Sequence, residues 1–382
     1  MNNYPKPIKR IRGQGFVDYT ITRRLPKILA AVENQLGESI DPAQMMLQAI
    51  INGGPINTTI FERPTNYWNE YLDRLTASTW DDLPFFDLEF LFYHGLNSMA
   101  GYFDTGTDIF YQIRKKALAK AIPDLAAGLA KLSELSDMAL LRATIHGALF
   151  ANETDYSQLI TSQGDASFWH ERILLDDSEP WLSSIQQNLE KRDIHIVADN
   201  AGHELCWDLV MVDAILRVCN PVNVVMHVKP WPMFVSDALS IDIEETLDRF
   251  QSNTLSDPMC TIGQRLRAAL EHGQLRIEAE ADWGEPRHFN GLNTHLKIVL
   301  SNAVSVISKG DLNYRRFTGD LQWPMDTPVS VATADVPFTG FALRVLKSDA
   351  LVGIEPSAVQ AAANQLNDCC PRGHFAVMQQ LT

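Results

Sequence analysis

The sequence predicts an α/β protein in which a mostly helical N-terminal region lies on a doubly wound α/β/α core. Apolar residues recur at helical spacing from about residue 18 to residue 150, for example at Leu25, Leu29 and Val32. After about Ser178 the pattern changes to short β-branched runs that alternate with helical stretches. Such continuous apolar runs are typical of parallel strands that helices bury on both faces.

The chain length and these two patterns predict two domains. With 382 residues, 46% of them hydrophobic, the chain is too long for one comfortable hydrophobic core. We expect a mostly helical domain over residues 1–177 and an α/β domain over residues 178–382. The predicted strands lie, in chain order, in DIHIVADNAG, VNVVMHVK, AVSVISKGD, PVSVATAD, ALRVLKSD and HFAVMQQL.

Composition restricts the partners and the location that we expect. The formal charge of -15 repels nucleic acid, but not a small anion whose site carries local cations. The five cysteines are odd in number and lack metal-binding C-x-x-C spacing, which favours a reducing compartment. No apolar run approaches the length of a membrane span, so we expect a cytoplasmic protein without a membrane or nucleic-acid partner. The number of subunits stays open.

The first predicted strand ends at two residues suited to bind a hard cation. Asp199 and Asn200 follow the apolar run 194–198, and ligands of doubly wound sheets bind at the carboxyl ends of strands. Carboxylate and amide oxygens are the ligands that hard cations prefer. Either residue alone would more simply cap the following helix. On that helix Glu204 and Asp208 are spaced i, i+4 and can share a face.

A second acid favours the metal-binding interpretation over the capping one. An apolar stretch ends at Phe234-Val235, and Ser236-Asp237 follow it. Acids at two neighbouring strand ends, here Asp199 and Asp237, repel one another unless a cation lies between them. The sequence therefore predicts a hard cation between these two strand ends.

Two further strand ends carry cations and hydrogen-bond donors. Gly310 has no side chain, so another group can approach its backbone closely. Near it in the sequence are Lys309, Asn313 and Arg315, which can donate hydrogen bonds to phosphate or sugar oxygens. A surface loop with clustered charges is the alternative interpretation of this run. A later run ends in Arg344-Val345-Leu346-Lys347. Lys347 is the better phosphate ligand because an ammonium is a compact charge, whereas Arg344 can form a structural salt bridge.

Motifs of three other enzyme classes are absent from the sequence. There is no G-x-x-x-x-G-K-[ST] loop, no G-x-G-x-x-G turn after a strand and no G-x-S-x-G elbow. Chemistry based on a P-loop, on a dinucleotide or on a nucleophilic serine therefore loses support.

Four motifs occur in order along the second half of the chain. They are DNAGHE with Asp208 and Asp213 downstream, FVSDAL, SKGDLNYRRFTGD and RVLK. Together they resemble the damage-control phosphatases, which form family eighty-nine of the domains of unknown function, and most of all the third subfamily. Similar pieces at residues 80–93, 102–116 and 152–157 extend the resemblance over nearly the whole chain.

The resemblance implies a fold, an activity and a set of site residues. The fold is a helical N-terminal region on a Rossmann-like α/β/α core. The activity is metal-dependent hydrolysis of small phosphorylated metabolites, in particular sugar phosphates such as fructose 1-phosphate and fructose 6-phosphate. Asp199, Asn200 and Asp237 are the implied ligands of a divalent cation, which is manganese, nickel, cobalt or magnesium. Asp199, Asp237 and Lys347 are the implied catalytic residues. The implied substrate-binding residues are Glu204, Asp311, Leu312, Asn313, Tyr314, Arg315, Arg344 and Asn152.

The sequence departs from the subfamily pattern at two places. The Arg-Thr-x-Lys signature has lost its hydroxyl in Arg344-Val345-Leu346-Lys347, and the Trp-Gly-Asn-x-x-Asp-Leu-Ser segment is altered over residues 150–157. These changes leave the substrate open, and the attacking group can be a metal-activated water or an aspartate. Two other functions stay compatible with the sequence, namely a methyltransferase that uses S-adenosylmethionine on protein carboxylates and a non-catalytic sensor of phosphorylated metabolites.

Overall fold

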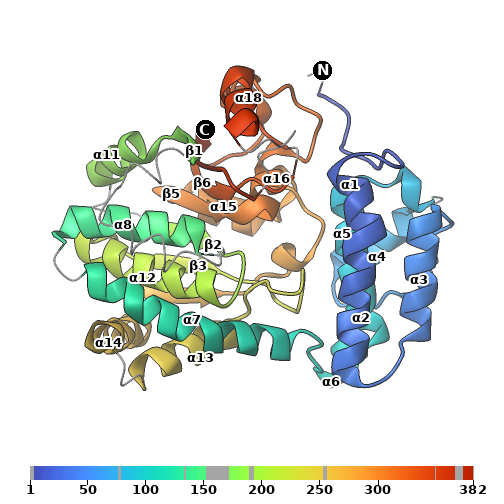
Figure 1. Ribbon diagram of the computed structural model, residues 1–382, viewed down its shortest axis with the longest axis horizontal. Coiled ribbons are helices and arrows are strands. Elements are labelled where there is room, and N and C mark those ends of the chain that lie inside the picture. The colour runs from blue at the N-terminus through green and yellow to red at the C-terminus, as the bar shows by residue number, and fades with distance from the viewer. Residues whose placement is uncertain are drawn as a thin grey trace.

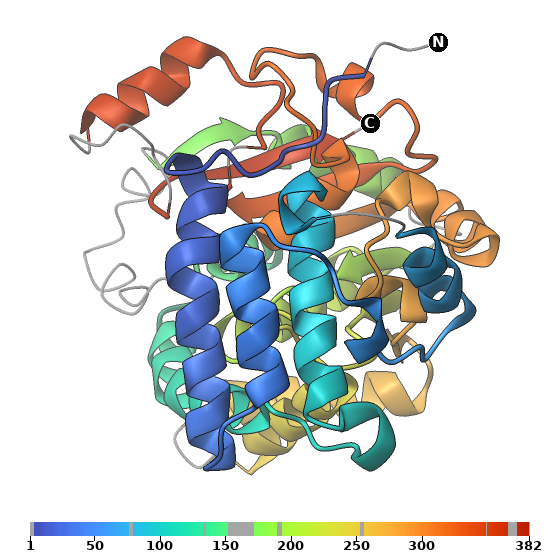
Figure 2. The ribbon, with the colours of Figure 1, turned by 90° about the vertical axis from the view of Figure 1, so that its right-hand side faces the viewer.

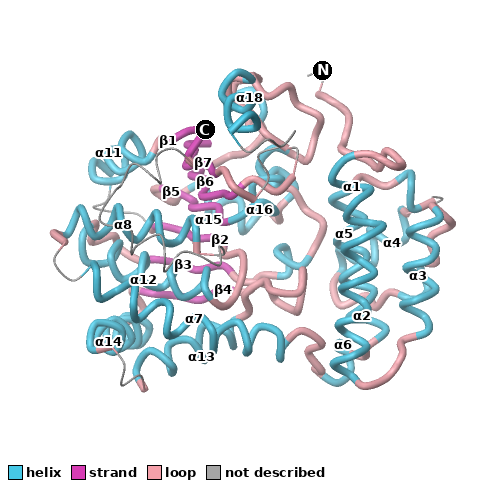
Figure 3. The backbone as a smooth tube through the Cα atoms, in the orientation of Figure 1, coloured by secondary structure: helices cyan, strands magenta, loops and turns pink. Residues whose placement is uncertain are grey.

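The computed structural model describes residues 4–75, 79–132, 135–151, 172–188, 193–252, 256–348, 350–365 and 373–381. It confirms the α/β class, because a bundle of helices stands beside a sheet that has helices on both faces (Figures 1 and 3). None of the described helices combines the length and the apolarity that crossing a membrane requires.

The bundle is built by the first part of the chain. Two of its helices, α2 and α3, have Pro in the first turn and are capped at their C-termini by the left-handed residues Gly37 and Gly53. Its central helix, α5, is buried on almost all sides because apolar residues occur around the whole helix. The elements are α1 (Gly15–Tyr19), η1 (Thr20–Arg24), α2 (Leu25–Leu36), α3 (Asp41–Asn52), η2 (Thr58–Ile60), α4 (Asn66–Arg74), η3 (Trp80–Asp82), α5 (Phe85–Met99) and α6 (Tyr102–Thr105).

The sheet has seven strands in the order β1-β7-β6-β5-β2-β3-β4. Neighbours from β6 through β5, β2 and β3 to β4 are parallel, as predicted, whereas β7 runs antiparallel to β6. The sheet is therefore mixed. The strands are β1 (Ile173–Asp176), β2 (Ile194–Val197), β3 (Val224–His227), β4 (Leu275–Glu278), β5 (Ser305–Lys309), β6 (Gly340–Val345) and β7 (Ala376–Leu381).

Helices cover both faces of the sheet. Neighbouring residues of β5 point to opposite faces, so Ile307 packs in one helical layer and Val306 in the other. The first layer contains α7 (Tyr111–Leu132), α8 (Asp137–Phe150), α11 (Ser178–Asn188), α12 (His203–Val218), α13 (Ser240–Gln251) and α14 (Asp257–Glu271). The second contains η5 (Ala281–Gly284), η6 (Phe289–Gly291), α15 (Thr294–Ser301), α16 (Gly310–Thr318) and α17 (Val329–Ala332), while α18 (Pro356–Gln365) packs near β7.

The hydrophobic cores group α7 and α8 with the sheet, and β1 is itself a strand of that sheet. The bundle helices share a separate core. The division into domains at residues 177 and 178 stays a prediction.

One predicted strand is wrong and two strands were not predicted. In the run 328–335, residues Val329–Ala332 form α17, since Pro328 before them has a φ of -55° and a short run can continue as a helical turn. The unpredicted strands β1 and β4 lie at the two edges of the sheet. They are four residues long and partly exposed, so they lack the continuous apolar pattern of the central strands.

The bundle packs against the edge at which the parallel strands end. Trp231 and Met233, from the loop after β3, and Leu312 of α16 share its hydrophobic core. Figure 2 shows the bundle helices, in blue and cyan, in front of the sheet. Polar groups at the carboxyl ends of the strands therefore lie between the sheet and the bundle.

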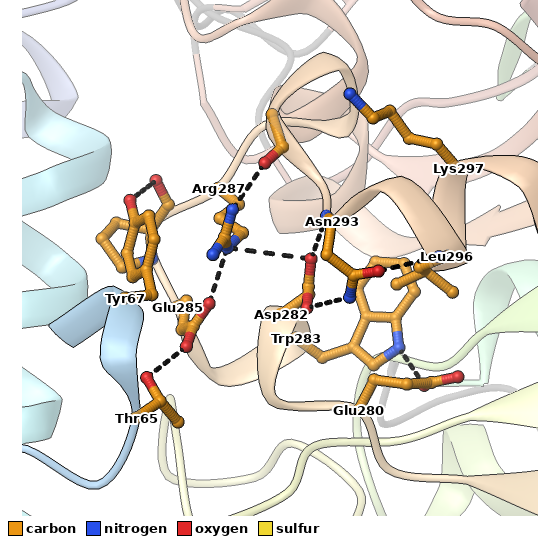
Figure 4. Close-up of polar contacts among 12 residues, drawn as sticks. Thr65, Tyr67, Glu280, Asp282, Trp283, Glu285, Arg287, Asn293, Leu296 and Lys297 are labelled. Carbon is orange, nitrogen blue, oxygen red and sulfur yellow. Dashed lines mark hydrogen bonds and ion pairs between the residues drawn. The ribbon is translucent and has the colours of Figure 1, made fainter. Parts of the chain in front are cut away.

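The loop after β4 fastens the bundle in this position (Figure 4). The buried Asp282 accepts hydrogen bonds of 2.6 Å from both the backbone N–H and the side-chain amide of Asn293, which fixes the loop. Thr65, the N-cap of α4, donates to Glu285 at 2.6 Å, and Arg287 donates to the other oxygen of Glu285 at 2.6 Å. The bundle is thus tied to the core by polar contacts as well as by packing.

Candidate functional site

The backbone brings Asp237 beside the end of β2. The sequence places Asp237 at the end of a strand, but the structure does not. The loop after β3 first extends to Phe234 and Val235, whose φ angles are 51° and 70°. The loop then returns to β2, where Asn200 and Asp237 form a β-bridge and Ala238 N–H donates to the Asp199 carbonyl at 2.8 Å.

The left-handed backbone of this loop is held by aromatic packing. The ring of Phe234 lies 5.0 Å from that of Phe90 and 4.7 Å from that of Tyr93, both on α5. Positive φ angles are costly for residues with large side chains and persist where packing enforces them. The bundle therefore helps to position Asp237.

Hydrogen bonds fix the orientation of the Asn200 amide. Its Nδ2 donates to Asp199 Oδ2 at 2.7 Å and to Glu204 Oε2 at 3.0 Å. Its Oδ1 accepts from the Ser236 hydroxyl at 2.5 Å. Since the two carboxylates hold the NH₂ group, the carbonyl oxygen points toward the loop that carries Asp237.

Asp199 lies at the centre of a buried cluster of like charges. Burial, and after it the charges of Glu204 and Asp237, raise the pKa of Asp199 well above its usual range, while Lys347 and Lys229 lower it in part. In the ranges that the structure describes, Asp199 forms no ion pair. A buried carboxylate of this kind favours either a proton or a cation.

Lys229, which directly extends the β3 run, is a site residue that sequence reasoning missed. Its ammonium lies 2.9 Å from Asp237 Oδ2, and both side chains are almost completely buried. Burial raises the pKa of the Asp237 carboxyl, and Lys229 opposes that rise. The rule that drew attention to acids after apolar runs applies equally to this lysine.

Lys309 forms a second buried ion cluster next to the first. Its Nζ lies 3.0 Å from Glu204 Oε1 and 3.0 Å from Asp208 Oδ1, and it donates to the Ala148 carbonyl. Burial alone would lower the pKa of this ammonium, but Asp208 and Glu204 outweigh burial and raise it. Lys309, one of the donors that the sequence offered for a phosphate, is therefore occupied within the protein.

The close approach predicted at Gly310 is found. Its φ is +77°, and a Cβ at this position would lie 2.0 Å from Asp199 Oδ2. A side chain here would displace the Asp199 carboxylate, so only glycine fits.

Asp311 organises the segment that carries Lys347. Burial raises the pKa of Asp311, but Arg344 and then Arg315 outweigh it and bring the pKa to about 2. Arg344 lies 2.7 Å from the Asp311 carboxylate, which also accepts from the backbone N–H groups of Lys347 and Ser348 at 3.2 and 3.1 Å. The Lys347 side chain is exposed, and it stays close enough to act on the pKa of Asp199.

Three other residues of α16 that are predicted to bind substrate have their side-chain contacts within the protein. Leu312 packs in the bundle core. Asn313 Nδ2 donates to the carbonyls of Ala198 and Lys309 at 3.1 and 2.9 Å, and Tyr314 donates to Gln379 at 2.9 Å. Their substrate-binding roles stay predictions.

Arg315 and Asn152 are also predicted to bind substrate. Arg315 pairs with Glu89 of α5 at 2.6 Å and with Asp320 at 2.7 Å, so it ties α16 to the bundle. Asn152 lies outside the described residues.

The donor set fits a hard divalent cation. Oxygens of Asp199, Asn200 and Asp237 come from two loops that a β-bridge holds together. In the part of the chain that the structure describes, no three His, Cys, Asp or Glu side chains cluster as a metal site, and the proposed set differs in containing an amide. The buried set has four carboxyl groups against two ammonium groups, so with every carboxyl group ionised it carries two net negative charges, which a divalent cation would balance. Its members are Asp199, Glu204, Asp208, Asp237, Lys229 and Lys309.

Known proteins with related sequences cover most of this chain. The model of the damage-control phosphatase ARMT1-like domain matches residues 20–361. Damage-control phosphatase ARMT1 of Xenopus tropicalis is 28% identical over 356 residues, which are 83% of this chain and 81% of that protein. The Danio rerio protein of the same name is 24% identical over 353 residues, 82% of this chain and 79% of its own.

A solved structure shares the fold. A duf89 family protein from Pyrococcus horikoshii has a TM-score of 0.54 and 14% sequence identity, and the match covers 98% of this chain and 100% of that one. At this identity the likeness concerns the fold alone. The match to the family model over most of the sequence shows that the chain belongs to the damage-control phosphatase ARMT1-like family.

Proposed function

We propose that this protein is a metal-dependent phosphatase that hydrolyses small phosphorylated metabolites, in particular sugar phosphates such as fructose 1-phosphate or fructose 6-phosphate. The observation that carries the proposal is the convergence of Asp199, Asn200 and Asp237 at the carboxyl edge of the sheet, where burial and the charges of Glu204 and Asp237 disfavour an Asp199 carboxylate that has no cation beside it. The curated relatives bear the name damage-control phosphatase, which supports the same reaction class.

In this proposal Asp199, Asn200 and Asp237 hold a divalent cation, Mn²⁺, Ni²⁺, Co²⁺ or Mg²⁺. When bound, it would supply positive charge against the phosphate oxygens. The protein is acidic, so local positive charge is what admits an anionic ester.

The residues of the chain position the substrate and neutralise its charge. Lys347 donates to phosphate oxygens, because its ammonium is exposed beside Asp199 while its backbone is fixed by Asp311. Gly310 leaves room for the Asp199 carboxylate. The bundle over the strand ends limits the entry of water, which strengthens these charge interactions.

The cytoplasm is the proposed location. The cysteines Cys206, Cys219 and Cys260 are free thiols, which fits a reducing compartment. A small phosphorylated metabolite is the proposed partner, without nucleic acid or membrane.

Phosphate release from a panel of sugar phosphates, with Mn²⁺ and with a chelator, tests the proposal. We expect release only with the metal, and its loss by at least roughly 100-fold in Asp199→Asn. Asp248→Asn is the matched control, because Asp248 is a surface acid whose side chain is 72% exposed. Metal-dependent ligand binding without release would instead identify a sensor, and release unaffected by the chelator would refute the metal dependence.

A further inference from the structure

The ammonium of Lys309 is enclosed by oxygens from two helices. Lys309 ends β5, is completely buried and points into the layer formed by α8 and α12. Its ammonium donates to the Ala148 carbonyl and lies 3.0 Å from both Glu204 Oε1 and Asp208 Oδ1, with which it forms ion pairs.

These three acceptors, which we call the Lys309 cage, have the chemistry of a metal site. Two carboxylates and one backbone carbonyl are hard oxygen ligands of the kind that bind divalent cations. The ammonium brings one positive charge to two carboxylates, so the cage keeps one negative charge. A cation that replaced the ammonium would meet favourable charge and suitable ligands.

One carboxylate separates the cage from the proposed cation site. Glu204 Oε1 forms the ion pair with Lys309, while Glu204 Oε2 accepts a hydrogen bond from Asn200 Nδ2, which also donates to Asp199. Lys309 therefore holds the Glu204 carboxylate in place. That carboxylate holds the NH₂ group of Asn200, so the carbonyl oxygen of the amide is the atom turned toward the proposed cation.

We propose that Lys309 is a built-in cation that fills a second oxygen cage beside the catalytic centre, so that the centre takes one exchangeable metal ion and Asn200 keeps its carbonyl turned toward that ion. Lys309 is a positioning residue in this inference, which rests on the proposed function for the role of the neighbouring site. The occupation of the cage by the ammonium does not depend on the identity of the substrate.

Counting bound Mn²⁺ in substituted proteins tests the inference. Lys309→Ala empties the cage and leaves space, whereas the control Lys309→Met removes the charge but keeps most of the volume. By equilibrium dialysis with Mn²⁺ detected by electron paramagnetic resonance, we expect about one ion in the wild type and in Lys309→Met, and about two in Lys309→Ala. Lys309→Ala with Asp208→Asn should return to about one ion, because the cage has then lost a carboxylate charge.

Thermal unfolding gives a second readout that does not require turnover. Mn²⁺ should raise the melting temperature of Lys309→Ala more than that of the wild type or of Lys309→Met, because an ion that binds only the folded state stabilises it. Folding of Lys309→Ala only in the presence of Mn²⁺ would also support the inference.

Other outcomes overturn it. If Lys309→Ala binds as many ions as the wild type, or fails to fold even with Mn²⁺, a metal ion cannot take the place of the ammonium. If the wild type binds no Mn²⁺ but Lys309→Ala gains an ion, the metal ion of the centre and the proposed metal dependence fail, while the occupation of the cage by the Lys309 ammonium stands.

Discussion

Removal of Lys229 should destabilise the protein strongly, because it leaves the Asp237 carboxylate buried without its partner. Coulomb's law with an effective dielectric constant of about 20 gives roughly 6 kcal/mol for two unit charges at the observed distance of 2.9 Å. Protonation of Asp237 relieves part of this loss, so we expect Lys229→Met to lower the free energy of unfolding by about 3 to 5 kcal/mol.

Urea unfolding followed by tryptophan fluorescence, in a chelator, measures this loss. Lys229→Met combined with Asp237→Asn should recover more than about half of it, since no unpaired charge remains. Arg276→Met is the control, because the Arg276–Asp193 pair is partly exposed and should contribute less than about 1 kcal/mol. A loss of less than about 1 kcal/mol in Lys229→Met would refute the reasoning that the pair is desolvated.

Three further changes test other parts of the structure. Gly310→Ala should lower kcat by roughly 100-fold, because the new Cβ would lie 2.0 Å from the present position of Asp199 Oδ2; unchanged kinetics would show that the carboxylate position is unimportant. Lys347→Met should raise KM by roughly 10-fold with the melting temperature unchanged, since Lys347 is exposed, and an unaltered KM would remove it from the substrate site. Burial raises the pKa of Asp87, which accepts from Tyr71, to about 6, so its contribution to stability is greatest below about pH 4 and is lost as pH rises through 6. Asp87→Asn should therefore stabilise the protein at pH 7 by about 3 kcal/mol and reduce the pH dependence of the free energy of urea unfolding between about pH 4 and 6; an undiminished pH dependence would contradict this assignment.

Continuous apolar runs predicted the central strands because these strands are buried on both faces. The same rule could not find β4, in which Leu275 and Ile277 alternate with Arg276 and Glu278 at an exposed edge. Alternation of this kind after Gly273 was the available signal. The run 328–335 shows the opposite failure, since β-branched residues there follow a proline and form a helical turn.

The acids of the site could be predicted, but their partners could not. Asp199 lies two residues after the end of β2, so the local sequence is enough to place it at the strand end. Asp237 reaches it through a loop whose left-handed Phe234 packs against Phe90 of α5, far away in the sequence, and no local pattern encodes this contact. For Lys309, the sequence favoured a phosphate donor because spacing along β5 does not reveal which acids of α12 face it.

The position of β7 between β1 and β6 has a consequence for how the chain reaches this structure. Ile173 pairs with Ala376, so β1 cannot join the sheet until β7, which lies about 200 residues later in the sequence, is in place. Contacts between such distant segments form slowly because a large loop must close first. We therefore expect a late step in refolding in which β7 inserts between β1 and β6. Until then the edges of β1 and β6 that pair with β7 are exposed, and they can pair wrongly with strands of another copy of the chain.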